Sequence, residues 1–223
     1  MEAEIVVFVA DAGSASKGNF HWVCSEHPDE ASDKADELSA RIVEHLNKGQ
    51  KVALGYECPL FVPCPQSHDL LGKSRIGECT IETGNRPFSA GAGASVFATG
   101  IQSLAWVLNG VKQQRPITKA TTSWTQFQGS DPDLFVWEAF VSGSEKAVPA
   151  SHVGDARLAI DAFVSILRET APRSAISDSE VFSVAGAAIL HSGLSDDLGL
   201  LRTPCLVLRP LRNAQILEAI HEG

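Results

Sequence analysis

Near its beginning the sequence carries a run of six apolar residues, Ile5–Ala10, that ends directly at Asp11. The run is continuous and rich in β-branched and aromatic side chains, which is the pattern of a strand buried on both faces. A strand of this kind needs further strands beside it and helices on both of its faces. The run therefore predicts an α/β protein.

The rest of the sequence alternates between strand and helix patterns. We expect further strands at Phe20–Ser25, Lys51–Glu57, Leu134–Val141 and Cys205–Leu208, and helices at Glu30–Lys48, Gly93–Gln114, Val153–Arg168, Ser179–Leu190 and Asn213–His221. This order predicts a single domain over residues 1–223, with a mixed sheet, helices on both faces and helical additions toward the C-terminus. Residues 65–91 show no period, and a loop of that length is often functional, so we expect a mobile flap there.

Charge and cysteine content narrow the functional classes. The chain has 18 Lys and Arg against 27 Asp and Glu, a formal net charge of −9, which argues against a non-specific nucleic-acid coat protein. The five cysteines are odd in number and scattered. We see no leader pattern and no apolar run of the ~18 residues that a membrane span requires. We therefore expect a cytoplasmic protein with free thiols that does not enter a membrane.

Acidic residues stand where two predicted strands end. Asp11 closes the first strand, and Glu57 follows the apolar residues Val52–Tyr56 of the third. Carboxylates are unfavourable inside a sheet, so their placement is informative. If the two strands are neighbours, Asp11 and Glu57 lie side by side at one edge of the sheet.

Two more acids belong to the same part of the predicted fold. Glu138 lies inside the fourth strand, between Trp137 and Ala139. Asp155 precedes Ala159 by one helical turn, about 40° around the helix axis, so it shares the buried face and approaches the sheet. Three or four carboxylates meeting at one point repel one another strongly unless a cation binds them. Hard oxygen ligands suit Mg²⁺ or Mn²⁺, and two such ions would support displacement at a phosphodiester.

Each acid also has an ordinary explanation. Asp11 can shape a turn, and Glu57 can be an exposed carboxylate at the edge of the sheet. Glu138 can pair with an arginine or lie on a solvated face. Asp155, in the first turn of a helix, complements the helix dipole. What favours a shared site is the occurrence of all four on the elements of one topology.

Four segments carry a resemblance to a known family. They are IVVFVADAGSASKGNFHWV, ALGYECPLFVP, VWEAFVSG and the helix start His152-Val153-Gly154-Asp155-Ala156-Arg157-Leu158-Ala159. Over roughly residues 4 to 170 the sequence resembles the RNase H-like superfamily, and most closely the family of predicted RNase H-like nucleases. The last segment is similar to the helix start of the Holliday-junction resolvase branch. One departure stands out, since only two predicted strands, not three, precede the first helix.

The resemblance implies a metal-dependent nuclease or phosphodiesterase. Asp11, Glu57 and Asp155 match the family's metal-binding acids, with Glu138 either as a fourth ligand or as a residue that supports the ligands. His152 would orient water or a phosphate oxygen. The implied cofactor is Mg²⁺ or Mn²⁺, and the implied substrate is a nucleic acid or a nucleotide.

Two cations are expected to bind substrate, and they bear on the alternatives. Lys17 closes the turn Asp11–Lys17, which looks like the phosphate-binding hairpin of sugar kinases and actin-like ATPases. Arg86 can place its own positive charge beside a phosphate. The chain can therefore instead be a binder of nucleotides or phosphorylated metabolites that uses this hairpin. A third possibility is a non-catalytic interaction domain that keeps the fold.

Overall fold

The computed structural model describes residues 4–13, 18–79, 87–141, 146–149 and 151–210, and it is an α/β structure with a mixed sheet. The strands lie in the order β3-β2-β1-β4-β7-β6, and β9 pairs with β7 near the end of that strand. Their bounds are β1 Ile5–Ala12, β2 Phe20–Cys24, β3 His27–Ser32, β4 Lys51–Tyr56, β6 Ala120–Thr121, β7 Leu134–Ala139 and β9 Val207–Leu208. The pairs β1–β2 and β2–β3 are antiparallel, whereas β4, β6, β7 and β9 extend the sheet in parallel.

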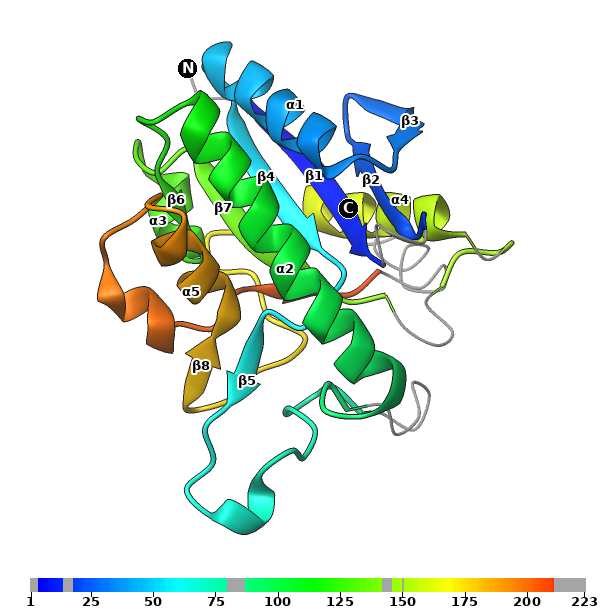
Figure 1. Ribbon diagram of the computed structural model, residues 1–223, viewed down its shortest axis with the longest axis vertical. Coiled ribbons are helices and arrows are strands. Elements are labelled where there is room, and N and C mark those ends of the chain that lie inside the picture. Colours follow the sequence, from blue (N-terminus) through cyan, green and yellow to red (C-terminus); the bar gives the residue numbers. More distant parts are fainter. Residues whose placement is uncertain (1–3, 14–17, 80–86, 142–145, 150, 211–223) are drawn as a thin grey trace.

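Helices cover both faces of the sheet (Figure 1). One face packs against α1 (Ala35–Asn47), α2 (Gly91–Gln114) and α5 (Val184–His191), and the other against α3 (Trp124–Gln128) and α4 (His152–Ser165). Strand β1 shows why both layers form, because Phe8 belongs to the first apolar core and Val9 to the second, and neither is exposed. The continuous apolar run at the start of the chain is thus buried on both sides, as predicted.

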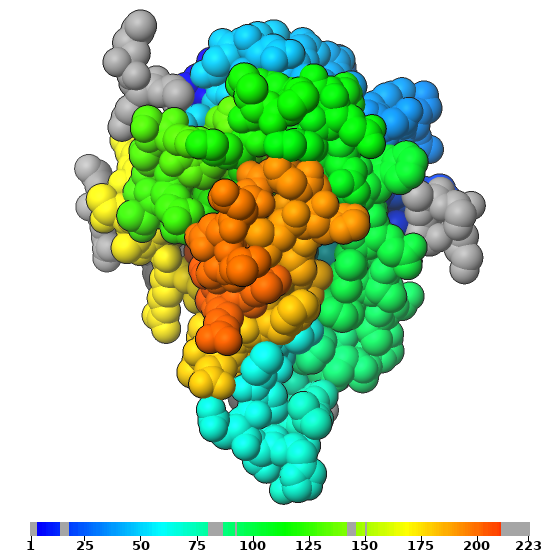
Figure 2. Space-filling model, turned by 60° about the vertical axis from the view of Figure 1, so that its left-hand side comes forward, coloured from blue at the N-terminus to red at the C-terminus, as the bar shows by residue number. Residues whose placement is uncertain are grey.

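A second, two-stranded sheet extends the molecule at one end. It pairs β5 (Phe61–Pro63) with β8 (Val181–Ser183) in antiparallel fashion. The segment after β5 contains the short helix η2 (His68–Leu70) and forms the projection drawn in cyan in Figures 1 and 2. Another short helix, η4 (Leu198–Arg202), follows α5 and packs against it.

Helix α2 crosses the first face of the sheet and approaches the ends of β1 and β4 closely. At Gly100 a Cβ atom would lie 2.4 Å from the sulfur of Cys58, so this approach needs glycine. Thr99 also donates a 2.9 Å hydrogen bond to the carbonyl of Ala12. Over Gly93–Gln114 the helix is long and apolar enough to cross a membrane, but here it contacts α1, α5 and β1. One helix of this length and composition is weak evidence for a membrane span. The prediction that the protein does not enter a membrane therefore stays untested.

Several predicted boundaries were wrong. The predicted helix Glu30–Lys48 begins only at Ala35, because residues 27–32 form β3. All of β3 is exposed or half-buried, so its sequence lacks the apolar alternation of a strand, and pairing with β2 defines it. The predicted helix Ser179–Leu190 divides into β8 and α5. The predicted helix Asn213–His221 lies outside the described residues.

Candidate functional site

The carboxyl ends of β1 and β4 bring two of the predicted acids together. The strands are parallel neighbours, with Ala10 paired to Tyr56, and the amide of Glu57 donates to the carbonyl of Ala10 at 2.8 Å. Asp11, the next-to-last residue of β1, and Glu57, the residue that follows β4, therefore lie next to each other. This is the neighbourhood that the sequence predicted if the two strands were adjacent.

Helix α4 brings two further predicted residues to this edge from the second face. Ser151 caps the helix by accepting a 2.9 Å hydrogen bond from the amide of Gly154. His152, the first helical residue, lies with Nδ1 2.5 Å from Oδ2 of Asp11. Asp155, one turn later, is only 3% exposed. The structure thus groups Asp11, His152 and Asp155, and the charge of Asp155 acts on Glu57.

The cation among these acids is Lys146, which the sequence did not single out. Its Nζ lies 3.1 Å from Oδ2 of Asp155, and the amide of Ala147 donates to Oδ1 of Asp155 at 2.7 Å. Burial lowers the pKa of Lys146, but the hydrogen bond to Asp155 and the nearby charge of Glu57 outweigh it and raise the pKa above its ordinary value. Asp155 therefore binds the segment before the helix.

Glu57 is the least satisfied member of the group. Its Oε2 is buried and has no hydrogen-bond partner among the residues that the structure describes. Burial, and after it the negative charge of Asp11, raises the pKa of Glu57 well above its ordinary value, while Lys146 acts in the opposite direction. A buried carboxylate oxygen without a partner is unfavourable unless a proton or a cation reaches it.

A second histidine adjoins the group and was also missed from the sequence. His21 on β2 pairs in register with Asp11 of β1. Its ring stacks on that of His152, with 5.6 Å between centroids and 6° between planes. Its Nδ1 is buried without a hydrogen-bond partner in the described part of the chain. Because its neighbour in space is set by strand pairing, only the β1–β2 register would have revealed it.

Glu138 has a different partner from the other predicted acids. Both of its oxygens bind the guanidinium of Arg75, each at 2.7 Å, and Oε2 also accepts from the amide of Leu60 at 2.9 Å. The guanidinium binds Glu78 as well, with Nη2 2.9 Å from Oε1. These side chains are almost fully buried. The arginine pair anticipated as the ordinary explanation is therefore what holds Glu138.

The same arginine bears on the predicted flap. Arg75 lies in the middle of residues 65–91, yet it is only 2% exposed and is fixed to β7 through Glu138. Ile76 also bridges to Ser177. This part of the segment is anchored to the core, which the lack of sequence period did not reveal. The two predicted substrate-binding cations, Lys17 and Arg86, lie outside the described residues.

A cavity of about 190 Å³ opens beside Glu57. Its polar lining includes Glu57, Glu78, Glu138 and Lys146, and its apolar lining includes Phe88, Val96 and Phe140. It lies next to the acid group, at the carboxyl ends of β4 and β7. In a sheet with parallel strands, this is the edge where ligands are usually bound.

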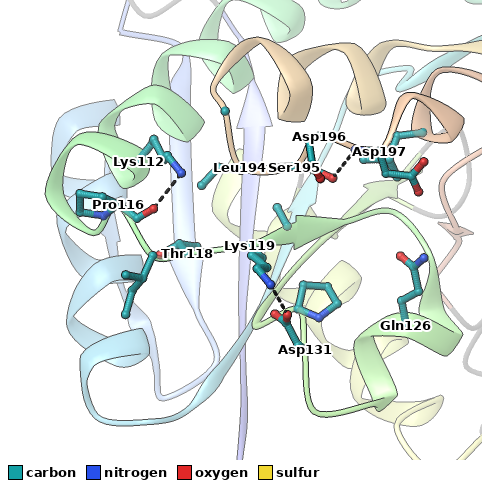
Figure 3. Close-up of a pocket in the computed structure, with 15 residues that line it drawn as sticks. Lys112, Pro116, Thr118, Lys119, Gln126, Asp131, Leu194, Ser195, Asp196 and Asp197 are labelled. Carbon is teal, nitrogen blue, oxygen red and sulfur yellow. Dashed lines mark hydrogen bonds and ion pairs between the residues drawn. The ribbon is translucent and has the colours of Figure 1, made fainter.

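A larger groove, of about 810 Å³, lies at the amino ends of β6 and β7 (Figure 3). Its lysines already have partners, because Lys112 donates to the carbonyl of Pro116 at 2.7 Å and Lys119 pairs with Asp131 at 2.6 Å. None of the predicted site residues that fall within the described ranges lines it. The smaller cavity is therefore the better candidate site.

The acids do not form a ready-made coordination site. Within the described ranges, no group of three or more His, Cys, Asp or Glu side chains is arranged to hold a metal ion. Asp11 is engaged by His152 and Asp155 by Lys146.

No protein-family model, curated protein or solved structure matches the chain.

Proposed function

We propose that the protein is a divalent-cation-dependent phosphodiester hydrolase with an RNase H-like core, acting at Asp11, Glu57 and Asp155. The observation that carries the proposal is the convergence of three carboxylates from β1, β4 and α4, one of them with a buried, unpartnered oxygen. Carboxylates in such a group repel one another, so the arrangement is unfavourable unless it serves to bind positive charge.

The topology supports the RNase H-like part of the proposal. Three strands, β1 to β3, form an antiparallel unit before the first helix, and β4 and β7 then extend the sheet in parallel on the other side of β1. The missing third strand was the departure from the family pattern in the sequence. With β3 in place that departure is removed, and the acids stand at the ends of the elements that the resemblance names.

The donor chemistry fits Mg²⁺ or Mn²⁺, with Asp11, Glu57 and Asp155 as the residues that would hold it. The orphaned Oε2 of Glu57 is the specific observation in favour of this fit. A bound divalent cation supplies a Lewis acid that polarises a phosphoryl oxygen and lowers the pKa of water. In the arrangement described here Lys146 provides the compensating charge at Asp155, so it has to move when a cation binds there.

The side chains of the protein would position the reacting groups. Asp11 fixes the Nδ1 side of His152, and the His152 side chain remains 52% exposed, so its other ring nitrogen is available to a phosphate oxygen or a leaving group. The amide of Ala147 fixes the orientation of Asp155. The stacked ring of His21 limits the rotation of His152.

The deciding experiment is a Mn²⁺ titration followed by thermal unfolding, at fixed ionic strength, together with cleavage assays on short DNA and RNA strands. The wild type should show a saturable rise in melting temperature, because the cation binds only the folded state. Asp155→Asn keeps the shape and should lose both the rise and cleavage. Asp161→Asn, an exposed acid on the same helix, is the matched control and should behave as wild type.

Absence of a saturable shift in the wild type would remove the chemistry of the proposal. The two alternatives, a nucleotide binder using Asp11–Lys17 and a non-catalytic interaction domain, both predict that Mn²⁺ leaves the melting temperature unchanged. They separate from each other by binding of adenosine triphosphate, which only the first of them predicts.

A further inference from the structure

The cavity of about 190 Å³ beside Glu57 combines apolar walls with a position next to the acid group. We propose that it receives one unstacked nucleobase of the substrate. The enzyme would then act beside a single-stranded, terminal or extruded nucleotide, not within a continuous duplex. This inference rests on the proposed function, whose substrate class it specifies.

Three elements supply the apolar walls. Phe88 precedes α2, Val96 lies on α2 and Phe140 follows β7, and each of the three is only partly buried. This exposure is informative because the other apolar side chains at these strand ends, such as Cys58 and Ala139, are 3% exposed or less. Apolar surface that is left open beside a polar centre is typical of a small-molecule site.

Neighbours support both aromatic rings. Phe97 contacts Phe88 edge to face, with 6.1 Å between centroids and 72° between planes. The guanidinium of Arg209 lies 4.5 Å from the centroid of Phe140. Rings held in this way lose little conformational freedom when a ligand stacks on them, which favours binding of a flat partner.

The size of the cavity limits its occupant. Sites for drug-sized ligands span roughly 300–1,000 Å³, so a cavity of about 190 Å³ takes one ring system and not a whole nucleotide with its phosphate. The phosphate would remain outside, toward the acids and Lys146. That division places the scissile bond at the group of carboxylates and the base in the cavity.

The charges of the side chains that line the cavity also favour a neutral nucleobase as its occupant. Within the described ranges the lining contains three carboxylates, Glu57, Glu78 and Glu138, and one cation, Lys146. Arg75, which pairs with Glu78 and Glu138, and Arg209, which lies over Phe140, are close by but do not line the cavity. In the lining itself carboxylates therefore outnumber cations, which disfavours an anion inside the cavity but not a neutral base. The formal net charge of −9 likewise disfavours a long duplex backbone over a short strand.

The way in which a base can reach the cavity indicates the class of substrate. A base inside a duplex is stacked on both sides and cannot enter a side cavity unless it is extruded. Bases of single strands, ends and mismatches unstack at much lower free-energy cost. The cavity therefore favours a substrate in which a base is already free.

Calorimetric titration in EDTA, with adenosine monophosphate and ribose 5-phosphate as probes, tests the inference. We expect the wild type to bind adenosine monophosphate at least tenfold more tightly than the sugar phosphate. Phe88→Ala should weaken adenosine monophosphate about five- to 150-fold, the range for losing one base–aromatic stack, and leave ribose 5-phosphate unchanged. Trp106→Ala, an exposed aromatic on α2 that does not line the cavity, is the control and should change neither.

Equal affinity for the two probes in the wild type, or an unchanged affinity in Phe88→Ala, would overturn the inference. If Phe88→Ala fails to fold, Phe88→Leu keeps the apolar volume, removes the stacking face and gives the same test. The measurement uses no cation and no turnover, so it is independent of the proposed function. Base binding without a Mn²⁺ shift would refute only the hydrolase, and a Mn²⁺ shift without base preference would refute only the nucleobase cavity.

Discussion

Two groups of carboxylates lie at the same edge of the sheet, and a different kind of cation neutralises each of them. Around Arg75, a rigid guanidinium binds Glu138 at both oxygens and Glu78 as well, at distances of 2.7 to 3.1 Å. Around Asp155, the compensating cation is Lys146, whose flexible side chain is 43% exposed. There one carboxylate oxygen, on Glu57, remains without a partner in the described part of the chain.

The kind of cation that neutralises a carboxylate distinguishes a structural group from a candidate binding group more clearly than the volume of the nearby cavity does. A carboxylate bound on every side, as Glu138 is, has little capacity left for a ligand, and its role is to join distant segments. A carboxylate held by a mobile ammonium can exchange that partner for another cation.

The largest expected effect comes from removing the arginine of the first group. Arg75→Met removes the guanidinium that binds the buried carboxylates of Glu138 and Glu78, which should cost about 3–5 kcal/mol of the free energy of unfolding. Chemical denaturation measures this directly. Arg41→Met, which breaks an exposed pair with Glu44, is the control and should change the stability little. A small loss in Arg75→Met would mean that the first group is not the rigid anchor described here.

Neutralising one acid in each group should have opposite effects on stability. Glu138→Gln weakens the bonds to Arg75 and should destabilise the cation-free protein by about 1.5–3 kcal/mol. Glu57→Gln removes a carboxylate whose charge is disfavoured by burial and by the negative charge of Asp11, so it should stabilise the cation-free protein at pH 8. Both are measured by denaturation in EDTA. Destabilisation by both would erase the distinction between the two groups.

The pH dependence of stability should show the same contrast. The pKa of Glu57 is raised in the folded state, so the folded protein favours its neutral form. The resulting contribution is fully present below the unfolded pKa of ~4.3 and is lost as the pH rises through the folded value. The stability of Glu57→Gln relative to wild type should therefore grow as the pH rises from 4 to 8. A constant difference over this range would mean that burial and the charge of Asp11 do not raise the pKa of Glu57 in the folded protein.

The sequence predicted the positions of the acids better than their partners. Asp11 and Glu57 end apolar runs, and Asp155 lies one helical turn before a buried alanine, so local periodicity was enough to place them. Glu138 was ambiguous because its partner, Arg75, is 63 residues away in a segment without period. Strand β3 was missed because none of its side chains is buried and only pairing with β2 defines it.

Lys146 could not be predicted for a related reason. It follows β7 in a polar stretch with no helical or strand pattern, so nothing local marks it as the cation of the acid group. Its position depends on the amide of Ala147 and its own ammonium both binding Asp155 of α4. Such a contact, between a loop and the next helix, follows from the path of the chain and not from residue spacing.

The smallest predicted effect concerns this lysine, and it tests whether Lys146 and a divalent cation compete for Asp155. In Lys146→Met the competing ammonium is gone, so Mn²⁺ should bind about two- to fivefold more tightly, because a half-exposed ion pair contributes at most ~1 kcal/mol. Lys119→Met, which breaks another exposed pair, should leave Mn²⁺ affinity unchanged. Weaker Mn²⁺ binding in Lys146→Met would show that the lysine supports the cation site. In both groups of carboxylates a fixed cation would then hold the acids in place. The difference between the group around Arg75 and the group around Asp155 would no longer hold.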